Sequence, residues 1–178
     1  MSTEIHDVQL ASKPSSRLLE QAARLGLQLP TDLERLAVLR GCSYYERNLG
    51  VRVPPLAEVP FSNAELAVAL VIPSLSPGAR EIRLAAALLG TSGLEANQVV
   101  RLAREENSVA VIRYIARCGQ SFEPENHFWE ELLAKLPPGP VDTDGFPHPT
   151  RFVEMTGIDR GKVGVLRRWI RPRSQIAA

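Results

Sequence analysis

The sequence has little of several features that would identify a function. Only two of its 178 residues are cysteine, and Cys42 and Cys118 stand apart without a Cys-x-x-Cys motif. Isolated thiols are typical of a reducing compartment, so we predict a cytoplasmic protein. Residues 1–17 are polar and lack the apolar region of a secretory signal. The longest apolar run, residues 66–72, is far too short for a bilayer, so we expect no membrane partner.

Signatures of metal, cofactor and catalytic sites are also missing. The three histidines have neither the i, i+4 spacing nor the cysteine partners of a zinc site: His6, His127 and His148. The Gly-rich stretch at residues 90–93 lacks both the lysine of a phosphate-binding loop and the spacing of a dinucleotide fingerprint. We therefore predict a non-enzymatic protein without metal or cofactor. An active site assembled from scattered residues stays an open alternative.

What the sequence does contain is helical periodicity. Apolar side chains recur every three or four residues, and they predict about seven helices that begin near residues 15, 31, 62, 76, 95, 108 and 125. Two capping boxes, Thr31-x-x-Glu34 and Ser62-x-x-Glu65, mark helix starts. Gly119 stands where a helix C-terminal cap is expected. The sequence thus predicts an all-α fold.

Similar residues recur in the predicted helices at an interval of about thirty positions. Glu65 recurs as Glu95 and Glu125, each near the start of a helix. With two helices per interval, residues 62–136 resemble HEAT- or armadillo-type helical-hairpin repeats, which stack because one hairpin cannot bury its apolar face alone. A plain helical bundle is the alternative, because helices of similar length joined by similar turns show the same echoes.

Composition divides the chain into four parts. Residues 1–14 read as a flexible tail, because they mix charge, serine and proline without a period. Residues 15–136 form the helical repeat or bundle domain. Residues 137–149 are rich in proline and glycine and read as a linker. Residues 150–178 form a basic C-terminal element.

The C-terminal element resembles the DNA-binding helix-turn-helix. Its apolar and glycine positions have the spacing of that motif: Val153, Gly157, Ile158, Val163 and Leu166. In that motif the glycine permits the left-handed turn, and the apolar positions lock the second helix across the first. Gly161 and Gly164 depart from the pattern, because they weaken the second helix. The resemblance implies a C-terminal pair of helices.

Charge supports nucleic acid as a partner of this element. Residues 150–178 hold seven basic side chains against Glu154 and Asp159, although the whole chain has a net charge of only +1. The candidate phosphate contacts are Arg160, Lys162, Arg167, Arg168 and Arg171. The alternative is a closing helical hairpin whose arginines suit a helix C-terminus.

Two functions follow from these features. The leading hypothesis is an adaptor or accessory protein that binds another protein through its helical face. Tyr44, Tyr45 and Trp129 are the candidate anchors for that partner, provided that they are exposed. The second hypothesis is a DNA-binding, transcription-regulator-like protein that uses residues 150–171.

Overall fold

The computed structural model describes residues 16–43, 60–140, 143–158 and 165–173. Within these ranges the chain is mostly helical, as predicted. The elements are α1 (Arg17–Arg24), α2 (Thr31–Leu39), α3 (Asn63–Ala69), the 3₁₀ helix η3 (Pro73–Leu75), α4 (Ala79–Leu89), α5 (Ala96–Glu105), α6 (Val109–Phe122), α7 (His127–Lys135), the 3₁₀ helix η4 (Pro149–Phe152), β1 (Val153–Ile158) and β2 (Val165–Trp169).

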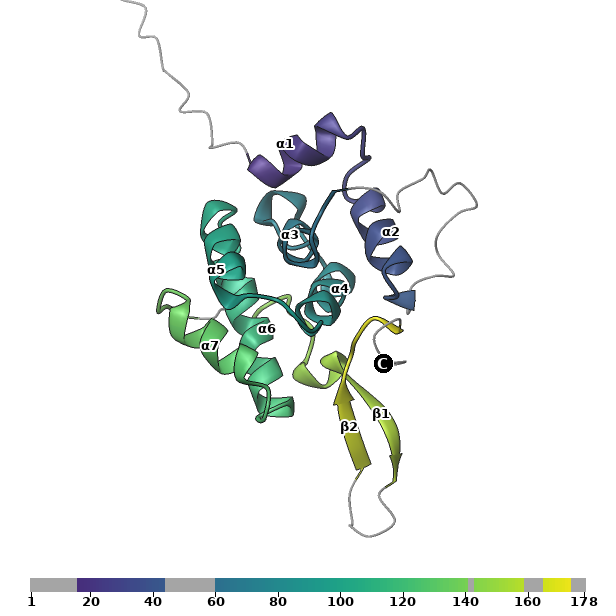
Figure 1. Ribbon diagram of the computed structural model, residues 1–178, viewed down its shortest axis with the longest axis vertical. Helices are drawn as coiled ribbons and strands as arrows, with labels where there is room; N and C mark the ends of the chain where they lie inside the picture. Colours follow the sequence, from purple (N-terminus) through teal and green to yellow (C-terminus); the bar gives the residue numbers. More distant parts are fainter. Residues whose placement is uncertain (1–15, 44–59, 141–142, 159–164, 174–178) are drawn as a thin grey trace, which may run out of the picture.

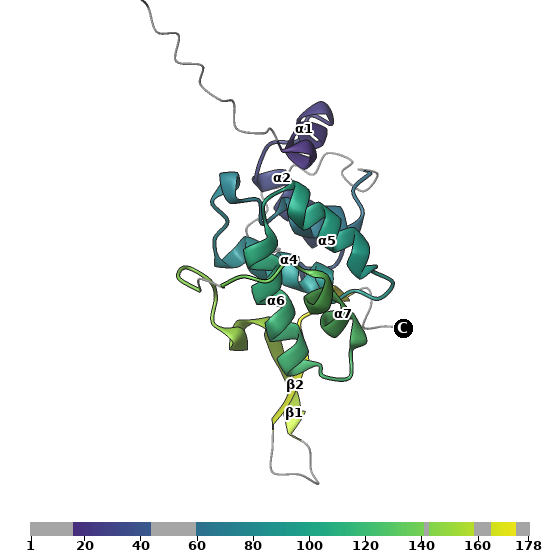
Figure 2. The same ribbon diagram turned by 90° about the vertical axis from the view of Figure 1, so that its left-hand side faces the viewer.

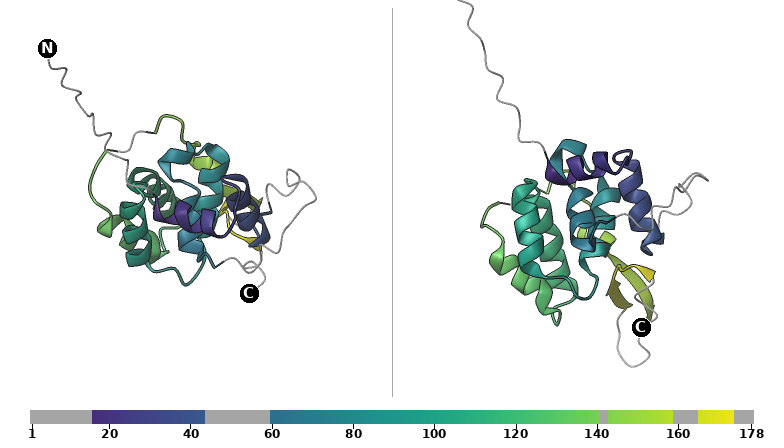
Figure 3. Two further views of the ribbon diagram at one scale, coloured as in Figure 1. Left: turned by 90° about the horizontal axis from the view of Figure 1, so that it is seen from above. Right: turned by 45° about the horizontal axis from the view of Figure 1, so that its top comes forward.

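The helices pack around a central pair. Figure 1 shows α3 and α4 nearly end-on at the centre, with α1 above them, α2 on one side and α5, α6 and α7 on the other, and Figure 3 shows the same helices from two further directions. Helix α3 contacts α1, α2, α4 and α5. The buried apolar side chains form one continuous cluster that extends from Leu18 to Ile170. The stacked-hairpin interpretation of residues 62–136 stays a prediction.

One of the two predicted capping boxes forms. Ser62 Oγ accepts from the Glu65 N–H at 3.1 Å, and Glu65 Oε2 accepts from the Ser62 N–H at 2.8 Å. The box at Thr31 is wrong, because α2 begins at Thr31 itself and Pro30 occupies the N-cap position. Asp32 instead turns back and accepts from the Gln28 N–H at 2.8 Å.

Gly119 does not end its helix. Helix α6 continues to Phe122, so the predicted C-terminal cap at Gly119 is wrong. A Cβ atom built on Gly119 would lie 2.3 Å from the ring of Trp129, which is fully buried. Glycine is therefore needed here for the close approach of α7 to α6 and not for a turn.

The C-terminal element is a β-hairpin, so the helix-turn-helix prediction is wrong. β1 and β2 pair antiparallel, with Val153 opposite Trp169 and Ile158 opposite Val165 (Figure 2). The register shifts between Met155 and Gly157. β-Branched residues and tryptophan suit a pleated strand better than a short helix, and the glycines of this segment weaken helices further.

The described residues of the predicted linker lie on α6. Tyr114 Oη donates to the Pro147 carbonyl at 2.6 Å, and the Arg113 guanidinium donates to the Gly139 carbonyl at 3.2 Å. The ring of Phe146 packs against Tyr114 with 5.0 Å between centroids. These contacts bring the chain across the helical body to η4 and the hairpin.

Candidate functional site

An aromatic cluster joins the base of the hairpin to the helical body. Phe152, Trp169 and Trp129 are all buried. The Trp169 ring centroid lies 5.0 Å from that of Trp129 and 5.6 Å from that of Phe152. Buried aromatic rings make some of the largest single contributions to core packing. The base of the hairpin is therefore part of the core.

Trp169 also makes a specific contact with the end of α4. Its indole Nε1–H donates to the Ala86 carbonyl at 3.1 Å. A Cβ atom built on Gly90 would lie 2.6 Å from the Trp169 ring, so the indole occupies the space that a side chain would fill. The hydrogen bond to Ala86 and the close packing on Gly90 thus fix β2 where it leaves the helical body.

Arg171 belongs to this base and not to the exposed part of the hairpin. Its guanidinium donates to Glu123 Oε1, and the pair is half-buried. The other carboxylate oxygen of Glu123 accepts from the Trp129 indole N–H at 3.0 Å. Arg171, which was a predicted phosphate contact, therefore lies in a polar network that ties the chain after β2 to the end of α6.

Beyond this base the hairpin projects from the helical body (Figures 1 and 2). We call residues 154–158 and 165–168 the hairpin arm. Met155 is 75% exposed, which is the highest value among the large apolar side chains of the described residues. Arg167 lies opposite Met155 and Arg168 lies opposite Glu154, and both arginines are exposed. Since side chains alternate along a strand, one face of the arm carries Met155 and Arg167 and the other carries Glu154 and Arg168.

The other predicted site residues are distributed differently. Trp129 is fully buried, because α7 packs its ring against Gly119 and Trp169, so it has no surface to offer as a partner anchor. Arg160, Lys162, Tyr44 and Tyr45 lie outside the described residues. Of the predicted nucleic-acid contacts, Arg167 and Arg168 are neighbours on β2, with their side chains on opposite faces of the arm.

Met155 was missed by reasoning from the sequence. The helix-turn-helix spacing predicts a helix at residues 153–157, and a single exposed methionine on a helix does not indicate a binding site. A period of two would place Met155 on the same face as Val153, which packs against the core, so the sequence holds no local signal for its exposure.

Both cysteines are buried and poorly suited to nucleophilic chemistry. Burial raises the pKa of Cys42 to about 12, although Arg40 nearby acts in the opposite direction. Burial likewise raises the pKa of the Cys118 thiol to about 11. The thiolate is the reactive form of cysteine, so neither side chain is activated at neutral pH.

The described residues offer neither a metal-ligand cluster nor a membrane-spanning helix. No group of three His, Cys, Asp or Glu side chains in the described ranges could hold a metal ion. Among the described helices, none combines the length and the apolar character needed to cross a bilayer.

Comparison with family models, curated proteins and solved structures found no match to this chain.

Proposed function

We propose that this protein is a non-enzymatic binding protein that recognises a partner protein through its hairpin arm. The observation that carries the proposal is Met155, an apolar side chain 75% exposed on an arm whose base is held in the core. An exposed apolar residue on a pre-positioned element contributes binding energy with little loss of conformational entropy.

The chemistry of the arm suits a protein partner. Methionine and arginine are both enriched in protein–protein interfaces, and the thioether adapts to irregular surfaces. Arg167 stands beside Met155 on the same face, so the partner surface should pair an apolar pocket with carboxylates. In the part of the chain that the structure describes, the sheet has two strands, so each strand also has an outer edge to which an extended segment can add.

The arm is a better supported site than the helical face. Leu25 and Leu39 are the exposed large apolar side chains of the described helical body, at 40% and 47%. Single apolar side chains on a surface are normal, and exposure alone does not make Leu25 or Leu39 a docking site. Met155 differs from them because it stands opposite Arg167 on a two-stranded arm with outer strand edges. We therefore propose the arm, and not the helical face, as the contact with the partner.

DNA is the second candidate partner, and a different observation favours it. Arg167 and Arg168 are adjacent and exposed on a two-stranded ribbon, and a ribbon of this width fits the major groove of B-DNA. Arginines on phosphates would supply most of the affinity. Met155 has no role in that mode apart from contact with a thymine methyl group.

Site-specific photo-cross-linking in the source cells tests the proposal. A photoreactive amino acid is placed at Met155 and, as a control, at Glu130, which is exposed on α7. We expect a discrete protein adduct from position 155 that is absent from position 130. The Arg167→Ala, Arg168→Ala double variant should lower the yield of that adduct. Adducts of the same composition from both positions, or none from position 155, contradict the proposal.

A titration with duplex DNA separates the second candidate from the first. Fluorescence anisotropy is measured at two salt concentrations for the wild-type protein and for the Arg167→Ala, Arg168→Ala variant. If both arginines contact phosphates, the slope of log K against log salt should become shallower by about 0.9 for each. A protein-binding arm predicts no complex near physiological salt. An arm-dependent complex with the shallower slope would replace our proposal with DNA binding.

A further inference from the structure

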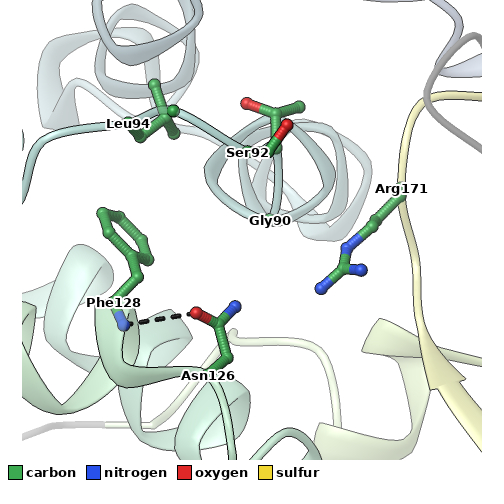
Figure 4. A pocket seen from close by; sticks show the side chains of 8 residues that line it. Gly90, Ser92, Leu94, Asn126, Phe128 and Arg171 are labelled. Atoms are coloured by element: carbon green, nitrogen blue, oxygen red, sulfur yellow. Dashed lines mark hydrogen bonds between the residues drawn. The ribbon is translucent and has the colours of Figure 1, made fainter. Parts of the chain in front are cut away.

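The base of the hairpin borders a cavity of about 380 Å³ whose central polar groups are committed to the fold (Figure 4). Arg171 donates to Glu123. The Asn126 amide donates to Glu123 at 3.2 Å and accepts from the Phe128 N–H at 3.2 Å. These side chains support the hairpin, so the reactive chemistry of this region lies on the arm and not in the cavity.

The described residues include three side chains that contain sulfur, and these differ sharply in accessibility. Cys42 is fully buried and Cys118 is 5% exposed, whereas Met155 is 75% exposed on the hairpin arm. Burial raises the pKa of the two thiols to about 12 and about 11, so both are protonated near neutral pH. The sulfur that solvent can reach in the described part of the chain is therefore the thioether of Met155.

This contrast decides where an oxidant reacts. A two-electron oxidant such as hydrogen peroxide attacks a cysteine according to its thiolate character and its exposure, and both cysteines have little of either. A thioether has no proton to lose, so access governs its reactivity. Peroxide should therefore react at Met155 and leave Cys42 and Cys118 unmodified.

The reaction transfers one oxygen atom to the side chain. A lone pair of the Met155 sulfur attacks one peroxide oxygen, so that a sulfur–oxygen bond forms and the oxygen–oxygen bond breaks. The hydroxide that leaves takes up the proton of the transferred oxygen, and the products are methionine sulfoxide and water. Sulfur is oxidised by two electrons, and peroxide is reduced by the same two. Reductases that act on methionine sulfoxide reverse the change.

Arg167 gives the oxidised side chain a partner on the arm. It is exposed and lies directly opposite Met155 in the register of β1 and β2. Side chains in such a position have Cβ atoms about 4.5–5.5 Å apart, which is within reach of two long side chains. A thioether is a weak acceptor, whereas the guanidinium has five donors and a sulfoxide oxygen accepts them well. Oxidation therefore strengthens the contact between Arg167 and residue 155.

We propose that Met155 is a site of reversible oxidation by peroxides, and that its sulfoxide switches off the hairpin arm. The switch rests on the proposed function of the arm, whereas the modification does not. Oxidation replaces the exposed apolar contact by a polar group and draws Arg167 toward it. Both features that suit a protein partner thus change with one oxygen atom. A bound partner covers Met155, so the free protein is the form that reacts.

Peptide mapping by mass spectrometry after treatment of the full chain with hydrogen peroxide tests the modification. We expect the peptide that contains Met155 to gain the mass of one oxygen at a rate close to that of N-acetylmethionine amide. The peptides of Cys42 and Cys118 should stay unmodified, and a methionine sulfoxide reductase with dithiothreitol should remove the added oxygen. Oxidation of either cysteine before Met155, or a rate at Met155 at least about tenfold below that of the blocked amino acid, contradicts the modification.

A photoreactive amino acid at Glu154 tests the switch, because it leaves Met155 and Arg167 in place. The protein is titrated with an extract of the source cells before and after oxidation, with the peroxide removed. The extract concentration that gives half of the maximal adduct should rise at least about tenfold on oxidation, as expected for the loss of one buried apolar side chain.

Two variants at the exposed position 155 serve as controls, and neither should disturb folding. Peroxide should not shift the half-maximal concentration of Met155→Leu, which keeps an apolar side chain without sulfur. Met155→Gln, which is polar like the sulfoxide, should need the higher concentration without any peroxide.

The outcomes separate the switch from the function on which it rests. If the untreated protein gives no adduct from position 154, the proposed function and the switch fail together, and the modification is judged by the peptide map. If the untreated protein gives an adduct and the sulfoxide gives it at the same extract concentration, the proposed function stands and the switch is refuted.

Discussion

A single methyl group added at Gly119 tests how tightly α6 and α7 are packed. Two effects of the Gly119→Ala substitution oppose each other. Alanine in a helix interior is favoured over glycine by about 1 kcal/mol. The new Cβ, however, would lie 2.3 Å and 2.4 Å from two atoms of the Trp129 ring, well inside van der Waals contact. One of the two must dominate, so the sign of the stability change is informative.

We expect the steric effect to dominate, because the Trp129 ring cannot move away. The ring is fully buried, lies 5.0 Å from the Trp169 centroid and 5.1 Å from that of Phe128, and donates to Glu123. Overpacking in such a core costs typically about 1–3 kcal/mol. Once the helix-propensity gain of about 1 kcal/mol is subtracted, the net loss of stability is up to about 2 kcal/mol. At about 2–4 °C per kcal/mol for a chain of this size, the melting temperature should fall by up to roughly 8 °C.

Urea unfolding followed by circular dichroism measures this change. Gln120→Ala, one residue further along on the exposed side of α6, is the matched control and should change stability by less than about 0.5 kcal/mol. In a Trp129→Phe background the smaller ring should relieve the contact, so Gly119→Ala should cost less there than in the wild type. A stabilised Gly119→Ala protein would refute the packing argument, because it would mean that the ring yields and helix propensity alone remains.

Three further results are expected. Leu132 is fully buried in α7, so Leu132→Ala should lower the free energy of unfolding by about 2–5 kcal/mol, and a loss under about 0.5 kcal/mol in urea titrations would contradict its place in the core. Burial raises the pKa of Cys42 and Tyr114 to about 12 and that of Cys118 to about 11. The protonated forms of these three groups stabilise the fold fully at a pH below their ordinary pKa values, and this contribution is lost as the pH rises above about 9. The melting temperature should therefore fall from about pH 9 upward. Both thiols should also resist a thiol reagent at pH 8. Deleting residues 1–14 should leave the melting temperature unchanged, because this segment offers no apolar period to bury.

The helices could be predicted because their signals are local. A helical hydrogen bond joins residues four apart, so the periodicity and the capping residues of a helix can both be recognised within one short segment of the sequence. Ser62 and Glu65 show this, since their side chains satisfy each other's backbone donors within a single turn. The failures at Thr31 and Gly119 are of another kind. Both are residue types typical of helix ends. Thr31, however, is the first residue of α2 and not its N-cap, and Gly119 lies inside α6, where the Trp129 ring occupies the space of a side chain.

The candidate sites could be predicted only in part. Arg167 and Arg168 were identified from charge, and both are exposed on the arm. Trp129 was named as a surface anchor and is buried, because exposure depends on which helices surround a residue and an apolar stripe does not specify its neighbours. The cavity at Arg171 is beyond sequence reasoning, since its walls come from residues 90–94, 126–128 and 171.

By itself the sequence determined a predominantly helical chain with a separate basic segment near its end, because composition and periodicity act over distances of a few residues. Only the tertiary structure decided that this segment is a pair of strands. The apolar and glycine spacing of residues 153–166 is compatible with two helices or with a hairpin, and the choice depends on what the segment packs against. Trp169 supplies that context by donating to the Ala86 carbonyl, 83 residues earlier in the chain, and by stacking on Phe152. Burial of the indole against α4 and α6 fixes β2 at its base and leaves Met155 and Arg167 on the arm beyond it.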